Sequence, residues 1–490
     1  MLMPRLFYLT SGLHSEMCED VLREPFIRDI ETALGCSFDV AGRDFSSYGA
    51  GPGELIYVRT GGTEGLFKEI FCKDGGRPVI GEPVRLLTSG KSNSLAASME
   101  ILSFLNLYGI RGEILHGSPQ YIASRIASGM HEPERTSCHP EPSVLSGAEG
   151  KAPCHPERSM CHPERSEGSS SQGHPHACHP ERSACHPERS EDPSEARDGD
   201  RQGAKSGEAA EGDLTLRVSP GRILAGCRLG VIGRPSDWLI SSNVDYDLAR
   251  SVLGVELVDV DMDELLAEIA MHSHPVVDVP PLNKPKFGNP IPEQDLAVAL
   301  DIYGALLHII AKYRLDGLTI RCFDLLGTVH NTGCLSLALL NSQGYTATCE
   351  GDIPAMISMA IARKVCGQSG FQANLSSVDG DRLLFAHCTV PLSMTRSWVY
   401  DTHFESGFGV AIHGELPVGD ATIFKLSPDF TKAFIAEATL EHNCYEGQLC
   451  RTQIILRAAG IAPYFLTTPI GNHHIILPGN HAEALRAILR

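Results

Sequence analysis

Two carboxylates follow directly on a short apolar stretch and are the first candidates for chemistry. Residues 345–349, YTATC, are typical of a buried strand, and Glu350 and Asp352 come immediately after it on either side of a glycine. Ile353 and Pro354 then begin a helical pattern, so Asp352 fits the N-cap of that helix with proline just inside it. Glu350 is left unexplained, because a carboxylate that ends a buried strand is costly unless it is paired or bound to a cation.

Histidines late in the sequence supply a second set of candidates. His473, His474 and His481 lie in an extended segment, GNHHIILPGNH, that is bounded by glycines. Side chains alternate between the two faces of a strand, so only one of His473 and His474 can point into a given site. A lone histidine is more often an ordinary core or surface residue. Together with a distant carboxylate it becomes a candidate metal ligand.

A third set of polar residues lies in the predicted strands of the last third of the chain. It comprises His387, Cys388, His403, Glu405 and His413. His403 and Glu405 are two residues apart, so in a strand they would share a face and could line a pocket. Each could equally form a cross-strand hydrogen-bonded pair, and for each residue taken singly the pattern slightly favours that interpretation.

The composition of the whole chain limits its class and partners. The 490 residues fit roughly two to four domains, and 42% hydrophobic residues are ample for more than one core. The formal net charge of -19 argues against nucleic acid and anionic membranes as partners. The glycine turns RTGGTEG and GRPSDW match neither the dinucleotide fingerprint nor a Walker loop. The first residues lack the apolar core of a signal peptide, and no run approaches the apolar length of a membrane span, so we expect a cytoplasmic protein.

A repeated motif interrupts the chain between residues 131 and 213. The sequence CHPERS recurs there, and the segment contains no Ile, Phe, Tyr or Trp. It cannot bury enough apolar surface to order itself, so we expect a disordered loop. Four of its cysteines are each followed by His, which raises the alternative of a metal-binding tract: Cys154, Cys161, Cys178 and Cys185. These pairs lack the spacing that folds around zinc, so an inert insertion is favoured.

Outside that segment, strands and helices alternate through the first 365 residues. The predicted strands include residues 5–10, 54–62, 83–89 and 228–233, and the predicted helices include residues 14–34, 63–71, 92–109 and 293–315. This alternation implies parallel sheets covered on both faces, with Glu350 at the carboxyl end of a strand, where such sheets bind ligands. After Cys366, short strands separated by Gly and Pro predict antiparallel β-structure. The predicted domains are residues 1–118, 119–365 and 366–490.

In this arrangement the chain resembles the L-fucose isomerase and L-arabinose isomerase superfamily, over its whole length apart from the insertion. The resemblance implies two Rossmann-like α/β domains, a β-rich, barrel-like C-terminal domain, and a manganese site formed by a Glu, an Asp and a His. Glu350 in TCEGD matches the family's Glu, which is also followed two residues later by an Asp. His473 in GNHHIILPG matches its His, including the distance to Gly479, so His473 is preferred to His474.

At the position of the family's Asp, this sequence departs from the family pattern. Asn374 in FQANLSS stands there, 24 residues after Glu350. Its amide oxygen can coordinate a hard cation, but the side chain cannot act as a base. The resemblance implies Mn²⁺ or another divalent cation on Glu350, Asn374 and His473, and proton transfer between C1 and C2 of a sugar through a cis-enediol. Glu350 would then act alone, or with help from Asp352, His387 or a water on the metal.

We therefore expect a divalent-metal-dependent aldose–ketose isomerase that acts on a free pentose or deoxyhexose. Arg59, Trp238, His387 and His403 are the candidates for sugar binding. The resemblance also implies a homo-oligomer, a hexamer or a similar assembly. Two alternatives stay open: a metal-dependent lyase that uses the same enediolate site, and a non-catalytic sugar-binding protein, which the amide at Asn374 would explain.

Overall fold

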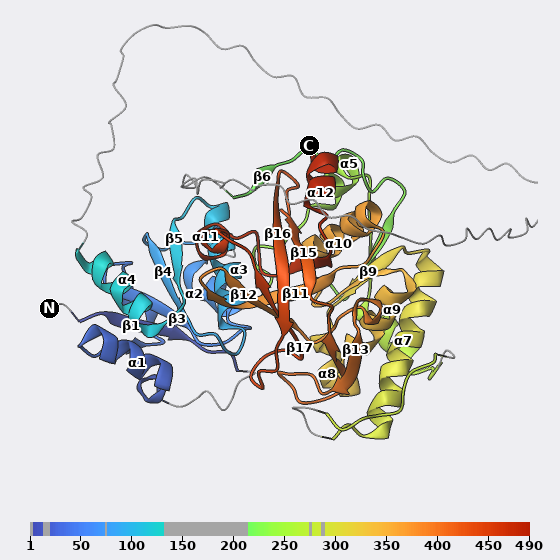
Figure 1. Ribbon diagram of the computed structural model, residues 1–490, viewed down its shortest axis with the longest axis horizontal. Helices are drawn as coiled ribbons and strands as arrows, with labels where there is room; N and C mark the ends of the chain where they lie inside the picture. The colour runs from blue at the N-terminus through green and yellow to red at the C-terminus, as the bar shows by residue number, and fades with distance from the viewer. Residues whose placement is uncertain (1–2, 13–19, 74–75, 132–213, 274–276, 286–289) are drawn as a thin grey trace, which may run out of the picture. The chain divides into compact units, whose positions relative to one another are not determined.

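The computed structural model describes residues 3–12, 20–73, 76–131, 214–273, 277–285 and 290–490 (Figure 1). The repeated motif lies outside the described residues, and so do both interpretations of it, the disordered loop and the metal-binding tract. Two parallel sheets and an antiparallel barrel make up the described part of the chain. The predicted fold class is therefore confirmed, while the predicted domain boundaries stay predictions.

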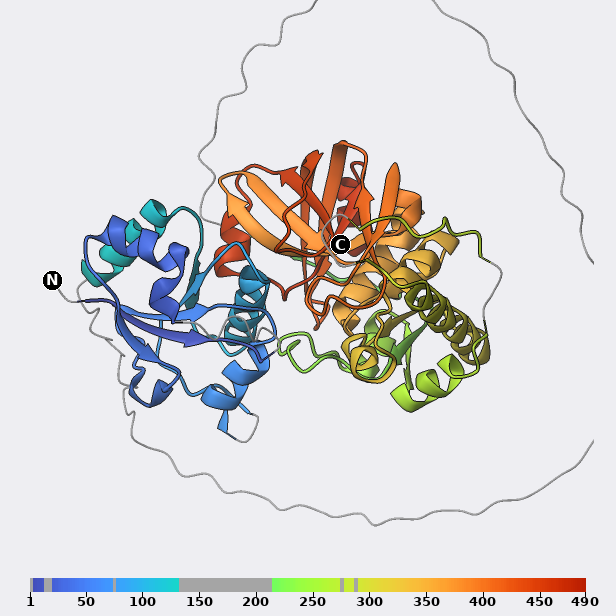
Figure 2. The ribbon, with the colours of Figure 1, turned by 90° about the horizontal axis from the view of Figure 1, so that it is seen from below.

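The first sheet has five parallel strands in the order β2-β1-β3-β4-β5. Its strands are β1 (Arg5–Leu9), β2 (Asp39–Gly42), β3 (Glu54–Val58), β4 (Val84–Thr88) and β5 (Gly112–Leu115), and its helices are α1 (Pro25–Leu34), α2 (Glu64–Phe71), α3 (Ser94–Leu107) and α4 (Pro119–His131). Neighbouring strand residues point to opposite faces: Leu6 packs with residues of α1 and α4, whereas Phe7 packs with residues of α2 and α3. Helices accordingly cover both faces of this sheet (Figure 2).

The first helix is shorter than predicted. Within the described residues it begins at Pro25 rather than near position 14, because Glu24 before it is extended and proline suits the first turn of a helix.

The second sheet has four parallel strands in the order β10-β9-β7-β8. Its strands are β7 (Arg228–Ile232), β8 (Glu256–Val260), β9 (Gly317–Ile320) and β10 (Thr346–Thr348). The helices of this region are α5 (Tyr246–Val252), α6 (Met262–Ile269), α7 (Glu293–Tyr313), α8 (Phe323–Val329), α9 (Cys334–Gln343) and α10 (Ile353–Cys366). The short edge strand β10 leads directly into α10, and the turn between them carries Glu350.

One helix of the second region corrects an expectation from the sequence. By length and composition alone, α7 is long and apolar enough to cross a membrane. Half of its most apolar window is buried inside the protein, and core helices pass the same test. The expectation that no apolar run approaches the length of a membrane span was therefore wrong. A helix that packs inside a protein core can be apolar around much of its circumference.

Six antiparallel strands close into a barrel in the order β15-β18-β11-β12-β17-β16, because β15 also pairs with β16. They are β11 (Phe371–Asp379), β12 (Arg382–His387), β15 (Gly419–Leu426), β16 (Lys432–Asn443), β17 (Thr452–Arg457) and β18 (His474–Pro478). The short strand β6 (Leu216–Arg217) adds to β16, while β13 (Ser397–Asp401) and β14 (Ala411–Glu415) form a separate hairpin. The helices α11 (Ala462–Thr467) and α12 (Ala482–Leu489) complete the region.

Two of these barrel strands were not predicted. β16, KAFIAEATLEHN, is rich in Ala and Glu, which favour helices, and β11, FQANLSSVD, is rich in polar residues that are uncommon in strands. Their pairing with neighbouring strands overrides these local preferences.

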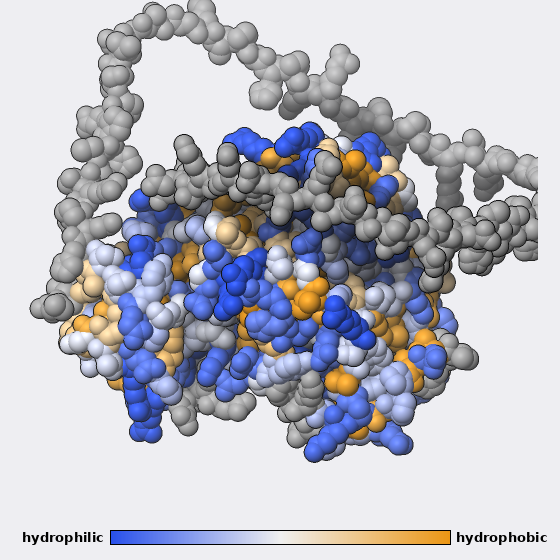
Figure 3. Space-filling view, viewed as in Figure 1, coloured by the Kyte–Doolittle hydropathy of each residue, from blue (hydrophilic) through white to orange (hydrophobic). Residues whose placement is uncertain are grey.

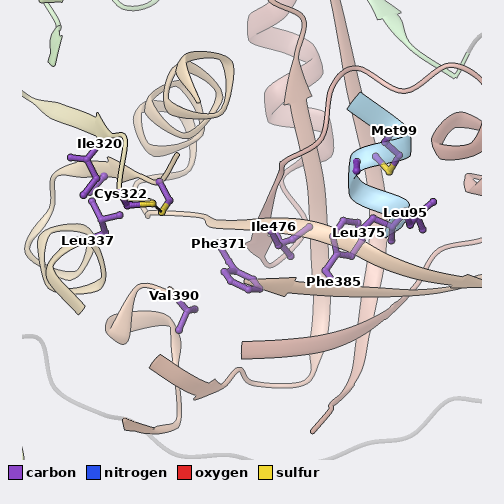
Figure 4. Close-up of a cluster of buried hydrophobic side chains, with 14 of the residues drawn as sticks. Leu95, Met99, Ile320, Cys322, Leu337, Phe371, Leu375, Phe385, Val390 and Ile476 are labelled. Carbon is purple, nitrogen blue, oxygen red and sulfur yellow. Dashed lines mark hydrogen bonds between the residues drawn. The ribbon is translucent and has the colours of Figure 1, made fainter. Parts of the chain in front are cut away.

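A continuous hydrophobic cluster joins the three regions. Leu95 and Met99 of α3 lie beside Leu375 of the barrel strand β11, and Ile320 of β9 belongs to the same cluster (Figure 4). α3 is buried from Ser94 to Leu105 for this reason. By contrast, the face shown in Figure 3 is mainly hydrophilic, with hydrophobic residues in small separate areas. The loops that lead out of the three regions are thus fixed by one shared core.

Candidate functional site

The backbone around Glu350 has an unusual conformation that aims its side chain. Glu350 and Gly351 are both left-handed, with φ of 65° and 69°. The carbonyl of Glu350 accepts a hydrogen bond from the Ser236 N–H at 3.0 Å, and the Gly351 N–H donates to the Ile320 carbonyl at 2.9 Å. A side chain on residue 351 would come within 2.5 Å of the Arg234 carbonyl oxygen, so the turn requires glycine there. A left-handed glutamate is strained and persists because these contacts hold it.

The carboxylate of Glu350 lies among two histidines and a tryptophan. Its Oε2 accepts a hydrogen bond from the Trp238 indole N–H at 2.7 Å. Its Oε1 lies 3.4 Å from His473 Nε2 and 3.6 Å from His387 Nε2. These two distances are too long for good hydrogen bonds. They are close to the spacing of about 3–3.5 Å between neighbouring ligands whose bonds to one divalent ion are about 2.1 Å long.

Glu350, His387 and His473 therefore form a group that could hold a metal ion. The side chains of His387 and His473 are almost fully buried, and that of Glu350 is 12% exposed. Nε2 of His473 is buried and makes no hydrogen bond within the described part of the chain, so a cation could bind it in place of a proton. The donor set of one carboxylate and two imidazoles suits first-row divalent metals.

Asp352 holds His473 in place and also caps the following helix. Its Oδ1 accepts a hydrogen bond from the Ala355 N–H at 2.7 Å, which confirms the predicted N-cap of α10. Its Oδ2 lies 2.9 Å from His473 Nδ1, an arrangement that fixes the proton on Nδ1 and turns Nε2 toward Glu350. The fully buried Lys425 of β15 places its Nζ 3.7 Å from Asp352 Oδ2. Asp352 thus links the ligand cluster to a buried cation in the barrel wall.

The charges in this cluster shift the pKa values of its members. Burial by itself would raise the pKa of Glu350, but the nearby imidazoles of His473 and His387 hold that pKa well below its usual range. Burial opposes protonation of His473, yet Glu350 and Asp352 outweigh it and raise the pKa of His473 to about 10. The metal-free cluster therefore keeps a proton on His473, and a divalent cation would displace it, since a metal ligand must be deprotonated.

Three neighbouring barrel strands bring the barrel residues to this cluster. Asn374 lies on β11, His387 ends β12, and His473 immediately precedes β18. Asn374 is buried, and its Oδ1 makes no hydrogen bond among the described residues. The sequence did not identify His387 as a candidate metal ligand, although it lies beside Glu350. Its approach to Glu350 depends on the pairing of β11 with β12, in which Asn374 lies opposite Ala386, the residue before His387.

A cavity lies next to Glu350. It is lined by Gly61, Gly62, Glu64, Asn93, Ala96, Ala97, Trp238, Phe323, Glu350, Asn374, Glu405 and Asn472. Most of these residues follow the carboxyl ends of parallel strands, namely β3, β4, β7, β9 and β10, which is where open parallel sheets bind ligands. Glu64 and Asn93 come from the first sheet and were not predicted, because nothing local distinguishes them from ordinary helix-start residues.

The polar atoms of the cavity wall are mainly hydrogen-bond acceptors. Four buried oxygens make no hydrogen bond within the described residues: Glu64 Oε2, Asn93 Oδ1, Asn374 Oδ1 and Asn472 Oδ1. Among the described lining residues, none is Lys or Arg. The cavity therefore suits a ligand rich in hydroxyl groups and is unfavourable for an anion.

The other predicted site residues divide between this cavity and elsewhere. Trp238 lies in the cavity wall, but Arg59 is buried in an ion pair with Glu24 and is not a lining residue. His403 and Glu405 lie in the loop between β13 and β14, not in a strand, so the expectation that they share a strand face was wrong. The glycines of the segment SGFG end the regular structure there. Of the two, Glu405 lines the cavity, while His403 packs its ring on Phe323.

The remaining histidines face away from the cluster. His474 Nε2 lies 2.9 Å from the Tyr464 hydroxyl, on the opposite side of β18 from His473, as strand alternation predicts. His413 stacks on Tyr445. His481 contacts Gln368 and the Pro478 carbonyl.

Comparison with known proteins gives a distant match. No family model matches the chain. Over 210 residues the chain is 23% identical to the sulfoquinovose isomerases of Priestia aryabhattai and Priestia megaterium, a match that covers 41% of this chain and 47% of each relative. The chain thus spans about half the length of the curated relatives it matches. This similarity supports a distant relationship to a sugar isomerase.

The buried pair of Lys425 and Asp352 leads to a prediction about stability. Replacing Lys425 by Met keeps the volume but leaves the carboxylate of Asp352 buried without this cation, so we expect the free energy of unfolding to fall by about 3 kcal/mol. Urea denaturation followed by circular dichroism measures the change. Lys312→Met, which removes an exposed ion pair with Glu264 on α7, is the matched control and should change little. Equal loss in both variants would contradict the prediction.

Proposed function

We propose that the chain is a divalent-metal-dependent aldose–ketose isomerase that acts on an uncharged pentose or deoxyhexose. The observation that carries this proposal is the buried cluster of Glu350, His387 and His473 beside a cavity lined by hydrogen-bond acceptors. The distant similarity to sugar isomerases supports the class of reaction. The proposal extends to a cytoplasmic homo-oligomer, a hexamer or a similar assembly, on the basis of the family resemblance.

In this proposal Glu350, His387 and His473 hold the metal, and the amide oxygen of Asn374 is a further oxygen donor. A bound Mn²⁺ or another divalent cation would act as a Lewis acid toward the oxygens on C1 and C2 of the sugar. The unpaired buried atoms Nε2 of His473 and Oδ1 of Asn374 support this assignment, because each lacks a partner that a cation would provide.

The protein itself orients the ligands and excludes water. Asp352 fixes the ring of His473, and the Trp238 N–H fixes one oxygen of Glu350. Trp238 and Phe323 pack edge to face, with ring centroids 4.8 Å apart, and form an apolar part of the wall. Sugar rings bind well to a wall of this kind, with an apolar surface on one side and amide or carboxyl oxygens that accept from hydroxyl groups on the other.

The charge of the cavity supports an uncharged substrate. Glu64, Glu350 and Glu405 all line it, and the described lining residues include no cation. The phosphate or sulfonate group of a charged sugar would have to enter a buried site beside carboxyl groups, at a large desolvation cost. The substrate named for the relatives is therefore not carried over to this chain.

The metal site predicts stoichiometric binding that depends on both sheet and barrel residues. We expect about one Mn²⁺ per chain, with affinity reduced by more than about 100-fold in Glu350→Gln and in His473→Ala, since each removes a ligand. Isothermal titration calorimetry on the metal-free protein measures this. His308→Ala, which replaces a half-exposed histidine on α7, is the control and should bind like the parent. A parent protein that binds no divalent cation would refute the isomerase proposal and favour a metal-free sugar-binding protein.

The substrate class predicts a discrimination between sugars. We expect the metal-loaded protein to interconvert L-arabinose or L-fucose with the corresponding ketose, and to lose this activity on chelation. Sulfoquinovose and a pentose phosphate should be converted at least about 100-fold less efficiently, because each carries an anion into a cavity that is lined by carboxyl groups and has no Lys or Arg among its described lining residues. Product analysis by NMR also separates the alternatives. A lyase would change the number of carbons in the product, and a non-catalytic relative would bind the sugar without converting it.

A further inference from the structure

Isomerisation through an enediol needs a group that moves a proton between two carbons, and the usual candidates in this cavity are poorly suited. Asn374 has an amide, which cannot take up a proton. Glu350 has its Oε2 occupied by the Trp238 indole and its Oε1 directed at two histidines.

Glu405 is the cavity carboxylate that is held in place but has an oxygen available. It lies in the loop between β13 and β14, and its Oε1 accepts a hydrogen bond from the Asn93 side chain at 2.7 Å. Asn93 in turn has a left-handed backbone at the start of α3, which is buried along most of its length. The other oxygen of Glu405 makes no hydrogen bond within the described part of the chain. The first sheet thereby fixes the position of a carboxylate that the barrel hairpin supplies.

The surroundings of Glu405 suit proton transfer near neutral pH. Burial raises the pKa of Glu405 to about 7, and the charge of Glu350 acts in the same direction, while His403 and the Asn93 hydrogen bond oppose the shift. Glu350 and Glu405 thus line one cavity in different settings: the indole and two imidazoles surround the first, and the Asn93 amide holds the second.

We propose that Glu405 is a catalytic residue that carries the proton between C2 and C1 of the sugar, an inference that rests on the proposed isomerase function. The carboxylate of Glu405 removes the proton from C2 of the open-chain aldose. The electron pair of that C–H bond becomes the C1–C2 double bond, and the carbonyl electrons move to O1, which takes the proton that the neighbouring O2 gives up. In the second half, Glu405 returns its proton to C1, and the electrons on O2 form the new carbonyl at C2. C1 is reduced and C2 is oxidised, so no other reactant is needed.

Glu64 is the other buried carboxyl group of the cavity and the main competitor for this role. It is the first residue of α2, and its Oε2 makes no hydrogen bond among the described residues. Burial raises its pKa well above the usual value, with Glu100, Glu350 and Glu405 adding to the shift. These surroundings favour the neutral form of the Glu64 carboxyl group, which suits a hydroxyl contact, whereas the proton acceptor must be ionised for part of the time.

The experiment compares variants of the full-length, Mn²⁺-loaded protein. L-arabinose and L-fucose are incubated in D₂O, and deuterium on C1 and C2 is followed by NMR together with kcat and KM. We expect Glu405→Gln, which is isosteric but cannot take up a proton, to lower kcat and deuterium exchange by at least about 100-fold. Its KM and Mn²⁺ affinity should stay within about threefold of the parent values. Glu405→Asp, which keeps a carboxylate on a shorter side chain, should recover part of the rate.

Controls and alternative outcomes make the test decisive. Glu441→Gln, which removes an ion-paired carboxylate on the barrel surface, should match the parent. Unchanged exchange in Glu405→Gln would overturn the inference and leave the isomerase proposal standing, as would loss of exchange in Glu64→Gln alone. A parent protein that binds the sugar but exchanges no carbon-bound hydrogen would overturn both proposals. Melting temperature and Mn²⁺ affinity show whether each variant is folded, and Glu405→Asp gives a second reading if Glu405→Gln is not.

Discussion

Two buried carboxylates, Glu350 and Asp352, depend on one histidine between them. His473 presents Nδ1 to Asp352 and Nε2 to Glu350, and it is itself fully buried. In a dry interior an unpaired carboxylate would be neutral or would destabilise the fold. The end of the second sheet and the edge of the barrel are therefore held together by charge as well as by packing. Every other element of the site is placed relative to this contact.

Local signals predicted those parts of the site that local rules control. Asp352 before Ile353 and Pro354 is an N-cap because short-range sterics and one hydrogen bond decide it. Strand alternation allows only one of His473 and His474 to face the carboxylate, the family resemblance selected His473, and the structure places the two side chains on opposite sides. The fold class was also accessible, because alternating strands and helices leave few architectures open.

Residues that depend on tertiary pairing were harder to predict. His387 comes to Glu350 only through the register of β11 and β12, and β11 has too many polar residues to be recognised as a strand. Glu64 and Asn93 reach the cavity because loops of the first sheet approach the barrel, which no spacing in the sequence encodes. For Arg59 the error was the reverse, because a residue predicted to bind the ligand does not do so. An arginine at a strand end suggested a ligand contact, but its side chain is buried in an ion pair with Glu24. In each case the partner, not the residue, decides the role.

The distance along the chain between Asp352 and His473 also sets an order in time. They are 121 residues apart, so at a synthesis rate of about 5–20 residues per second the ribosome makes the two carboxylates roughly 6–24 s before the histidine that neutralises them. During that interval the nascent second sheet contains Glu350 and Asp352 but not the imidazole of His473. The two carboxylates then favour contact with water, so the core at the end of β10 stays open. Closure of this part of the protein is therefore coupled to the arrival of β18, and the cation site forms among the last features of the newly made chain.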